Sequence, residues 1–180
     1  MDYIKMQSIP RLSKTCYITE KIDGTNACVH VSEGGEIRAG SKNRWLTTEK
    51  DNHGFATFVK EREDLFRKVL PPGFHRGEFW GNGIQRGYGL PKGDRRLSLF
   101  NQKLKIKLNS SIEWPFDFVP ILYKGMFDTS IVELMLKVLK LGSISVPGYM
   151  NPEGVVVYHE AANCMFKKTI EHDEGKHCNG

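Results

Sequence analysis

Apolar and polar residues alternate with a period of two over several short stretches of the chain. This alternation is typical of strands that have one face in the core and the other in solvent. It predicts strands over 15–22, 27–31, 36–39, 97–101, 103–108 and 118–123, and a fully buried strand over 155–158. Asp23 and Gly24 separate the first two stretches, and Asp-Gly between alternating apolar residues typically forms the turn of a β-hairpin. We therefore expect residues 15–31 to form a hairpin.

Two other stretches carry apolar residues at helical spacing. The first is predicted to begin at a cap on Asp51 or Asn52, to place its aromatic residues in the core and to end at Pro71. The second has the form of a capping box over 130–133 and ends at Gly142. Its residues are apolar nearly all round, so we expect it to be well buried. Strands and helices do not alternate regularly, which predicts the α+β class with antiparallel sheets.

Glycine is concentrated between residues 73 and 89, where it occupies six of seventeen positions. Glycine serves where the backbone needs unusual angles or where another part of the chain approaches closely. Arg76, Gln85, Arg86 and Tyr88 lie in the same stretch. Two interpretations stay open: an elaborate surface loop, or a loop that lines a site with polar groups.

Composition narrows the class of protein. The apolar fraction is 39%, and no stretch approaches the roughly 20 apolar residues of a membrane span, so we expect a globular protein without a membrane partner. The N-terminus has no apolar segment of the secretory kind, which points to the cytoplasm. The net charge of +5 is compatible with phosphate-rich ligands but does not require them.

The four cysteines show no Cys-x-x-Cys spacing, and we interpret them as buried or free thiols. They are Cys16, Cys28, Cys164 and Cys178. His172, His177 and Cys178 match no standard metal-site spacing and are interpreted as part of a polar tail over 171–180.

Lys21 stands two residues before the Asp-Gly turn, in the stretch Glu20-Lys21-Ile22-Asp23-Gly24-Thr25-Asn26. Lys-x-Asp-Gly is also the nucleophile motif of nucleotidyltransferases that form a lysine–nucleotide phosphoramide. Alone it is weak evidence, because it occurs by chance in roughly a few per cent of chains of this length. Five further motifs follow in order: 39–45, 77–81 with 83–88, 98–101, 152–157 and 166–169.

With these motifs in this order, the chain resembles the ATP-dependent RNA ligase family. That family belongs to the covalent nucleotidyltransferase superfamily of RNA and DNA ligases and capping enzymes. The closer resemblance is to the branch found in phage and bacterial genomes, and it covers residues 21–168. It implies an adenylation domain of the ATP-grasp-like ligase type over 1–170, with antiparallel sheets, flanking helices and the nucleotide between them. Many such ligases carry a C-terminal OB-fold or helical domain, and we expect no such domain in this chain. A partner protein could supply the missing domain.

The resemblance implies a three-step reaction with ATP and Mg²⁺ or Mn²⁺. Lys21 attacks the α-phosphorus of ATP and pyrophosphate leaves. AMP then passes to a 5′-phosphate end of RNA, which we favour over DNA, and a 3′-hydroxyl displaces AMP to join the strands. A free lysine has a pKa of about 10.4 and is protonated at neutral pH. Neighbouring cations and desolvation must therefore favour the neutral, nucleophilic amine.

The resemblance also assigns roles around this lysine. Lys167 and Lys168 are expected to supply positive charge and to hold the α-phosphate, and we favour Lys167. Glu153 and Asp23 are the carboxylates expected to bind the metal, directly or through water.

Four further residues are expected to contact the nucleotide. Phe100 is similar to the residue that stacks on adenine, and Glu78 to the one that contacts the ribose hydroxyls. Lys42 stands where the family commonly shows arginine, so we place the arginine role, facing the ribose or acceptor phosphate, on Arg44. Glu20 is expected to help read the base through its backbone. Without the resemblance, Phe100 would be interpreted as a core strand residue.

Two other functions remain open from the sequence. The same lysine chemistry could serve another base or acceptor, as in a capping-type guanylyltransferase or in the transfer of AMP to a protein. Alternatively, the chain could be a catalytically weak ligase-like module that binds nucleic-acid ends.

Overall fold

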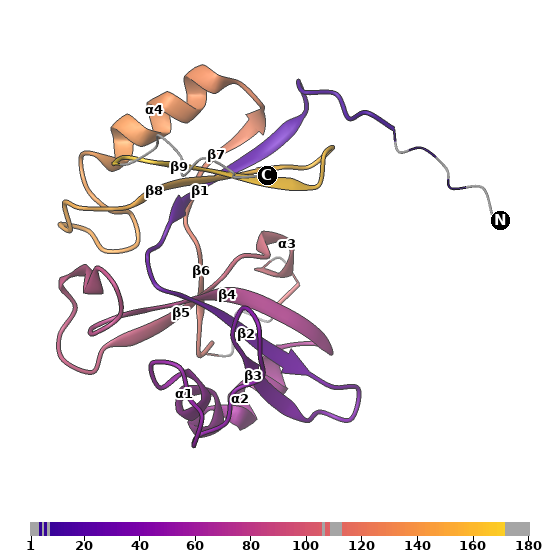
Figure 1. Ribbon diagram of the computed structural model, residues 1–180, viewed down its shortest axis with the longest axis vertical. Helices are drawn as coiled ribbons and strands as arrows, with labels where there is room; N and C mark the ends of the chain where they lie inside the picture. Colours follow the sequence, from indigo (N-terminus) through magenta and orange to yellow (C-terminus); the bar gives the residue numbers. More distant parts are fainter. Residues whose placement is uncertain (1–3, 5, 7, 106, 109–112, 172–180) are drawn as a thin grey trace. The chain divides into compact units, whose positions relative to one another are not determined.

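The structure is a computed structural model that describes residues 4, 6, 8–105, 107–108 and 113–171. It consists of two compact units (Figure 1). Unit 1 comprises Met1–Lys21 and Pro120–Gly180, and unit 2 comprises Ile22–Val119. The predicted tail beyond residue 171, with His172, His177 and Cys178, lies outside the described residues.

Unit 1 is a four-stranded antiparallel sheet in the order β7-β1-β8-β9, with helix α4 along one face (Figure 1). Its elements are β1 (Thr15–Lys21), β7 (Ile121–Met126), α4 (Thr129–Leu139), β8 (Gly154–His159) and β9 (Cys164–Thr169). Alternate residues of β1 and β8 pack against α4 and form the core of the unit. They are Cys16, Ile18, Val155 and Val157, which contact the helix residues Val132, Leu136 and Leu139.

Unit 2 is a five-stranded sheet in the order β3-β2-β4-β5-β6, antiparallel except for the parallel β5–β6 pair. Its strands are β2 (Thr25–Val31), β3 (Ile37–Gly40), β4 (Gly73–Gly81), β5 (Arg95–Leu99) and β6 (Asp117–Phe118). Its helices are α1 (Phe55–Glu61), α2 (Glu63–Val69), α3 (Gln102–Lys105) and the 3₁₀ turn η1 (Gly87–Gly89).

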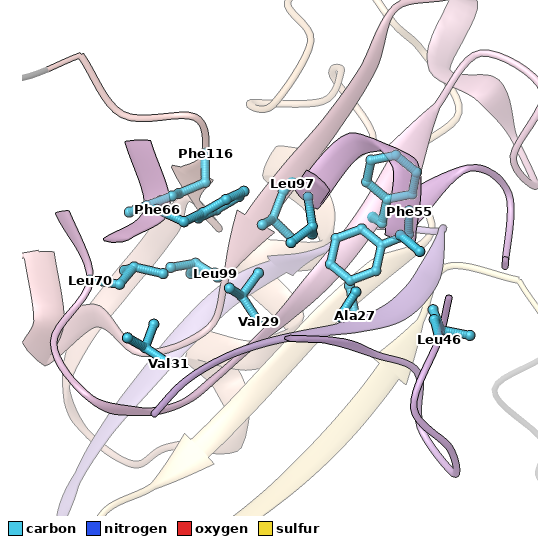
Figure 2. Packing of buried hydrophobic residues seen from close by; sticks show 14 of the residues in the cluster. Ala27, Val29, Val31, Leu46, Phe55, Phe66, Leu70, Leu97, Leu99 and Phe116 are labelled. Atoms are coloured by element: carbon cyan, nitrogen blue, oxygen red, sulfur yellow. The ribbon is translucent and has the colours of Figure 1, made fainter. Parts of the chain in front are cut away.

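The core of unit 2 lies between one face of this sheet and helices α1 and α2. Figure 2 shows its packing, in which Val29 and Leu99 from the sheet meet Phe55 and Phe66 from the helices. Phe55 and Phe66 are buried, which confirms the prediction that the aromatic residues of this helical stretch face the core. Leu65, on α2, stays partly exposed.

The predicted hairpin over 15–31 is wrong. Its two strands belong to different sheets: β1 pairs with β7 and β8, whereas β2 pairs with β3 and β4. The backbone of the intervening turn is held by other partners, since the Asp23 amide donates to the Tyr88 hydroxyl and the Gly24 amide to Glu78. Long-range pairing has therefore overridden the local Asp-Gly signal.

The strand predicted over 103–108 is also wrong, because the chain forms the short helix α3 there. Asn101 explains the difference. Its side-chain oxygen accepts from the Lys103 amide and its carbonyl accepts from the Leu104 amide, so it starts a helical turn in spite of the alternating pattern. Ile106, the midpoint of that prediction, lies outside the described residues.

Two predicted elements are each divided in the structure. The helix expected up to Pro71 breaks at Arg62, whose φ of −119° and ψ of 16° separate α1 from α2. The strand expected over 118–123 divides into β6 and β7 at Pro120, which has no amide hydrogen to donate.

Other details of the helices and of the glycine-rich stretch also differ. Asp128 caps α4, because its side chain accepts from the Ser130 amide, so the capping box predicted at Ser130 is wrong. That helix is buried on one side only, with Leu134 49% exposed. Half of the glycine-rich stretch is the strand β4, which lies between β2 and β5, rather than a surface loop.

The remaining predictions agree with the structure. Strands cover all of 155–158, residues 37–39 of the stretch 36–39 and residues 97–99 of the stretch 97–101, so Phe100 and Asn101 lie beyond the end of β5. Antiparallel sheets with flanking helices are present as expected. Cys16 and Cys28 are buried free thiols, and Cys164 is an exposed one. Among the helices of the described residues, none has the length and apolar character needed to cross a membrane.

Asp51 provides a first test of how the chain folds locally. The N-cap of α1 is Gly54, so the cap predicted at Asp51 or Asn52 is wrong in position. The Asp51 carboxylate nevertheless accepts hydrogen bonds from the first-turn amides of Ala56 and Thr57 at 2.7 and 3.0 Å. Burial alone would raise the pKa of this carboxyl, but these bonds outweigh it and hold the pKa below its ordinary value. We expect Asp51→Ala to lower the free energy of unfolding by about 1–2 kcal/mol at pH 7.

The stabilisation by Asp51 should depend on pH in a definite direction. A carboxyl whose pKa is lowered by folding stabilises fully above its unfolded pKa, about 3.9, and loses that contribution as the pH falls through the folded value. The difference between wild type and Asp51→Ala should therefore shrink below about pH 4. Urea denaturation followed by tryptophan fluorescence measures it, because Trp45, Trp80 and Trp114 all lie in unit 2. Glu33→Ala, an exposed carboxylate between β2 and β3, is the control; an equal loss at pH 7 and pH 3 would contradict the assignment.

Candidate active site

Lys21 is the last residue of β1, and its amine lies 2.5 Å from a carboxylate oxygen of Glu153. The register of the sheet brings them together, since Lys21 pairs with Gly154, the residue after Glu153. The Lys21 and Glu153 side chains are 23% and 17% exposed. A pair so shielded from water interacts more strongly than a surface ion pair. The predicted nucleophile, Lys21, therefore lies at one end of β1 in contact with Glu153, a predicted metal ligand.

Gly154 allows the strands around this pair to approach closely. Its φ is +155°, and a Cβ atom at this position would lie 2.3 Å from the carbonyl oxygen of Lys168. Any other residue would push β8 away from β9 or distort the backbone after Glu153. The glycine of the Pro-Glu-Gly motif thus fixes the position of the glutamate.

Lys167 and Lys168 lie on opposite faces of the sheet in unit 1. Lys167 is in register with Val156, which is in register with Thr19, so Lys167 shares the face of Thr19 and Lys21. Lys168 is in register with Val155 on the face that α4 covers. Its amine lies 2.5 Å from the carboxylate of Glu133 on that helix.

Glu20 is buried, with 1% of its surface exposed. Its carboxylate accepts hydrogen bonds from the Ser143 and Ser145 hydroxyls at 2.6 and 3.0 Å, and from the Ile144 and Ser145 amides at 2.9 Å each. Its side chain is therefore committed to the loop after α4. Only its backbone would be available to a base, and its amide already donates to the Pro120 carbonyl.

Asp23, the other predicted metal ligand, belongs to unit 2. One of its carboxylate oxygens lies 3.1 Å from Nε of Arg86. Its amide donates to the hydroxyl of Tyr88, whose ring is buried edge-on against Trp80. Arg86 and Tyr88, for which the sequence left two interpretations open, thus hold the Asp-Gly turn in place.

Glu78 extends from β4 and also contacts this turn. Its carboxylate accepts from the Gly24 amide at 3.2 Å and from the Asn26 side chain at 3.1 Å. Gly24 must be small here, since a Cβ would lie 2.4 Å from the Phe79 carbonyl oxygen and 2.7 Å from Cβ of Trp80.

Beside Glu78 lies a pocket of about 450 Å³ within unit 2, which is in the size range of small-molecule sites. It is lined by Gly24, Thr25, Asn26, Ser41, Lys42, Asn43, Arg44 and Glu78. The structure therefore brings Glu78 and Arg44 together. The Arg44 guanidinium donates to the carbonyl of Lys50 at 2.9 Å, which orders the loop. Phe100, 36% exposed after the end of β5, is not in this lining, and its stacking role remains a prediction.

The donor atoms suit Mg²⁺ or Mn²⁺ in kind. Both Glu153 and Asp23 offer carboxylate oxygens, which hard divalent cations prefer. The described residues contain no group of three or more histidine, cysteine or carboxylate side chains placed to hold a metal. Mg²⁺ usually binds through one or two carboxylates together with water and substrate phosphates, so such a group is not required.

No pattern in the sequence indicates that the loop at 143–145 or the ring of Tyr88 contacts motif residues. The Ser-Ile-Ser stretch looks like an ordinary loop in the sequence, and its contact with Glu20 spans more than 120 residues. For Tyr88 the only signal in the sequence is its place in the glycine-rich stretch.

The chain is similar to known RNA ligases in sequence pattern and in fold. A family model described as RNA ligase matches residues 14–169. No curated protein matches the chain. Among solved structures, an RNA ligase variant from Naegleria gruberi with ATP and manganese has a TM-score of 0.68 at 17% identity, covering 89% of this chain and 51% of that one. A variant of the same ligase with AMP and manganese has a TM-score of 0.64 at 18% identity, covering 88% of this chain and 50% of that one.

A third variant of the same ligase, without ligand, gives a TM-score of 0.66 at 18% identity over 87% of this chain and 50% of that one. At these identities the likeness shows a shared fold. The chain spans about half the length of these ligase chains.

Glu20 provides a test of the frame that holds Lys21. Glu20→Ala would leave the Ile144 and Ser145 amides without their acceptor. Each unpaired group costs about 1–3 kcal/mol, so we expect unit 1 to lose about 2–4 kcal/mol of stability. Amide hydrogen exchange at residues 144 and 145 should speed up by at least about 30-fold. Glu171→Ala, an exposed carboxylate, is the control. Unchanged exchange at 144 and 145 in Glu20→Ala would show that the loop does not depend on this carboxylate.

Proposed function

Because the chain belongs to the RNA ligase family, we propose that it joins polynucleotide ends in an ATP-dependent reaction through a covalent lysyl-AMP intermediate, with RNA preferred over DNA. One observation carries the proposal. Lys21, the lysine of the Lys-x-Asp-Gly motif, is partly buried against Glu153 and shares a sheet face with Lys167. The Naegleria gruberi ligase binds ATP or AMP with manganese, which supports ATP and Mg²⁺ or Mn²⁺ as cofactors here.

In the first step, a bond forms between Nζ of Lys21 and the α-phosphorus of ATP, and the bond to the bridging oxygen of the β-phosphate breaks. The electron pair leaves with pyrophosphate. The attacking amine must lose a proton, and Glu153, 2.5 Å away, is positioned to accept it. Lys167, on the same face, is suited to neutralise charge that develops on the α-phosphate.

The later steps are chemically similar. A 5′-phosphate oxygen attacks the same phosphorus and the lysine amine leaves, and then a 3′-hydroxyl displaces AMP from the activated end. A divalent cation bound by Glu153 or Asp23 would supply charge neutralisation at the phosphates. Glu78 and Arg44, which line the pocket in unit 2, are the candidates to contact the ribose and a phosphate.

Labelling of the protein tests the proposal directly. Incubation with ATP labelled at the α-phosphate, together with Mg²⁺ or Mn²⁺, should attach the label to the protein, and peptide mass spectrometry should locate AMP on Lys21. Lys21→Ala should reduce labelling to background, because no other amine takes the place of the nucleophile. Lys14→Ala, a neighbouring exposed lysine, should label like the wild type.

Three results of this experiment would contradict parts of the proposal. Wild-type protein that never takes up AMP, or Lys21→Ala that still does, would refute the lysyl-AMP intermediate. Competition by unlabelled GTP rather than ATP would favour a capping-type guanylyltransferase.

The two lysines of β9 should differ in their effects. Lys167→Ala is expected to slow labelling by about 100-fold or more, the usual effect of losing a group that stabilises transition-state charge. Lys168→Ala should slow it by less than about 10-fold, because its partner is Glu133 on α4. Glu133→Ala is the matched control and should resemble Lys168→Ala. A larger effect at Lys168 than at Lys167, measured as single-turnover rates, would reverse the assignment.

A further inference from the structure

Three aromatic rings form a cluster on unit 2, outside the lining of the pocket beside Glu78. The rings of His30 and Phe74 lie 4.4 Å apart, those of Trp45 and Phe74 lie 6.0 Å apart at an angle of 26°, and those of His30 and Trp45 lie 5.7 Å apart. Trp45 is 48% exposed and Phe74 59% exposed. We call His30, Trp45 and Phe74 the aromatic shelf.

Strand pairing builds the shelf. His30 on β2 is in register with Phe74 on β4, so their side chains share a face of the sheet. Trp45, in the loop after β3, packs against Gly40, where a Cβ would lie 3.4 Å from the indole ring. The shelf therefore lies on the face opposite to the core, since Val29 and Val31 of β2 point toward α1 and α2.

The shelf continues the sheet face that carries Glu78. Phe74, Arg76 and Glu78 alternate along β4 and so point to the same side. Four residues of strand place Phe74 and Glu78 about 13 Å apart. Arg76 is exposed midway between them. Arg38, in register with His30, is exposed at the other border, where it forms an exposed ion pair with Glu36 at 2.9 Å. One exposed arginine, Arg76, thus lies between the pocket and the exposed rings, and a second, Arg38, lies on their far side.

Exposed aromatic groups bordered by cations are suited to one kind of ligand above others. Removing large aromatic side chains from water is favourable, so a patch of them left exposed usually marks a binding surface. Unpaired bases stack on aromatic rings while arginines follow the phosphates, and this combination is typical of proteins that bind single-stranded nucleic acid. Bases within a duplex already stack on one another and have no free face to offer.

We propose that the aromatic shelf stacks unpaired bases of the polynucleotide whose reacting end is handled at the Glu78 pocket. The proposal rests on the proposed function, which makes a polynucleotide the partner of this face. In this proposal the shelf stacks the bases next to the joined end, and Arg76 and Arg38 bind the backbone phosphates. The pocket beside Glu78 holds the terminal nucleotide.

Equilibrium binding tests the shelf without any ligation chemistry. The probe is a 5′-phosphorylated single-stranded RNA of about 12 nucleotides with a 3′-fluorescein label, titrated with the full chain in the absence of ATP. Fluorescence anisotropy gives the dissociation constant. Trp45→Ala and Phe74→Ala should each weaken binding by about 5- to 100-fold, and Trp45→Phe, which keeps a ring, by less than about 3-fold. Leu65→Ala, a similarly exposed apolar residue on α2, is the matched control and should bind like the wild type.

A second probe separates stacking from general damage to the site. An abasic strand of the same length keeps the phosphates and loses the rings. Against it, the penalty of Phe74→Ala should fall below about 2-fold, because the interaction that the substitution removes is already missing. A blunt duplex of the same sequence should bind more weakly than the single strand. Thermal unfolding of each variant checks that the fold is kept.

The proposal is overturned if wild-type protein does not bind the single strand, if the alanine variants bind as tightly as wild type, or if their penalty is the same with the abasic strand. These failures are distinct from failure of the ligase proposal. If Lys21 takes up no AMP but the shelf variants lose RNA binding as expected, the ligase proposal is refuted and the proposal for the shelf stands. If Lys21 takes up AMP but the shelf variants bind RNA as tightly as the wild type, only the proposal for the shelf is refuted.

Discussion

The ion pair between Lys21 and Glu153 depends on the register of three strands. β1 must pair with β8 so that Lys21 faces Gly154, and β8 must pair with β9 so that Thr169 lies beyond it. A shift by one residue would turn Lys21 to the face that α4 covers and Glu20 to the other. The buried residues Cys16, Ile18 and Glu20 alternate along β1 and prevent such a shift, because it would bring them into solvent. Core packing and the candidate site are thus set by the same constraint.

Glu20 shows how closely the structural and chemical roles are joined. A buried carboxylate is costly unless hydrogen bonds satisfy it, and four donors from the loop after α4 do so. The nucleophile candidate therefore follows immediately after a residue that is fixed on nearly every side. This is the arrangement that a site needs when positioning is its main contribution to catalysis.

In unit 2 the same principle operates through β4. One strand supplies Glu78 to the pocket, Phe79 to the core and Phe74 to the aromatic shelf. The alternation of a strand places these residues on two faces, so the face away from the core can be polar and aromatic without disturbing the core. Besides the carboxylate of Glu78, that face carries the exposed arginines Arg76 and Arg38, which suit phosphates and can also stack on rings.

The sequence alone determined the order of the motifs, most strands and the identity of the candidate nucleophile. Two of these signals are local: Lys-x-Asp-Gly, which contains Gly24, and Pro-Glu-Gly. Each can be read from neighbouring residues, because the amine, the carboxylate and the glycine without a Cβ belong to consecutive or nearly consecutive positions. Support of the first turn of α1 by Asp51 could also be predicted, since its carboxylate and the two amides that donate to it lie within six residues, although the N-cap itself is Gly54. Family resemblance then linked motifs that no local rule connects.

Only the tertiary structure decided which elements meet. The Asp-Gly signal predicts a hairpin, but β1 and β2 gain more by pairing within two separate sheets, and no local pattern reports that choice. The opposite faces of Lys167 and Lys168 follow from the pairing of β9, so the sequence could name both lysines but not separate them. The loop that satisfies Glu20 and the rings that form the shelf are likewise contacts between distant residues. Such contacts depend on register and burial, which exist only once the sheets are assembled.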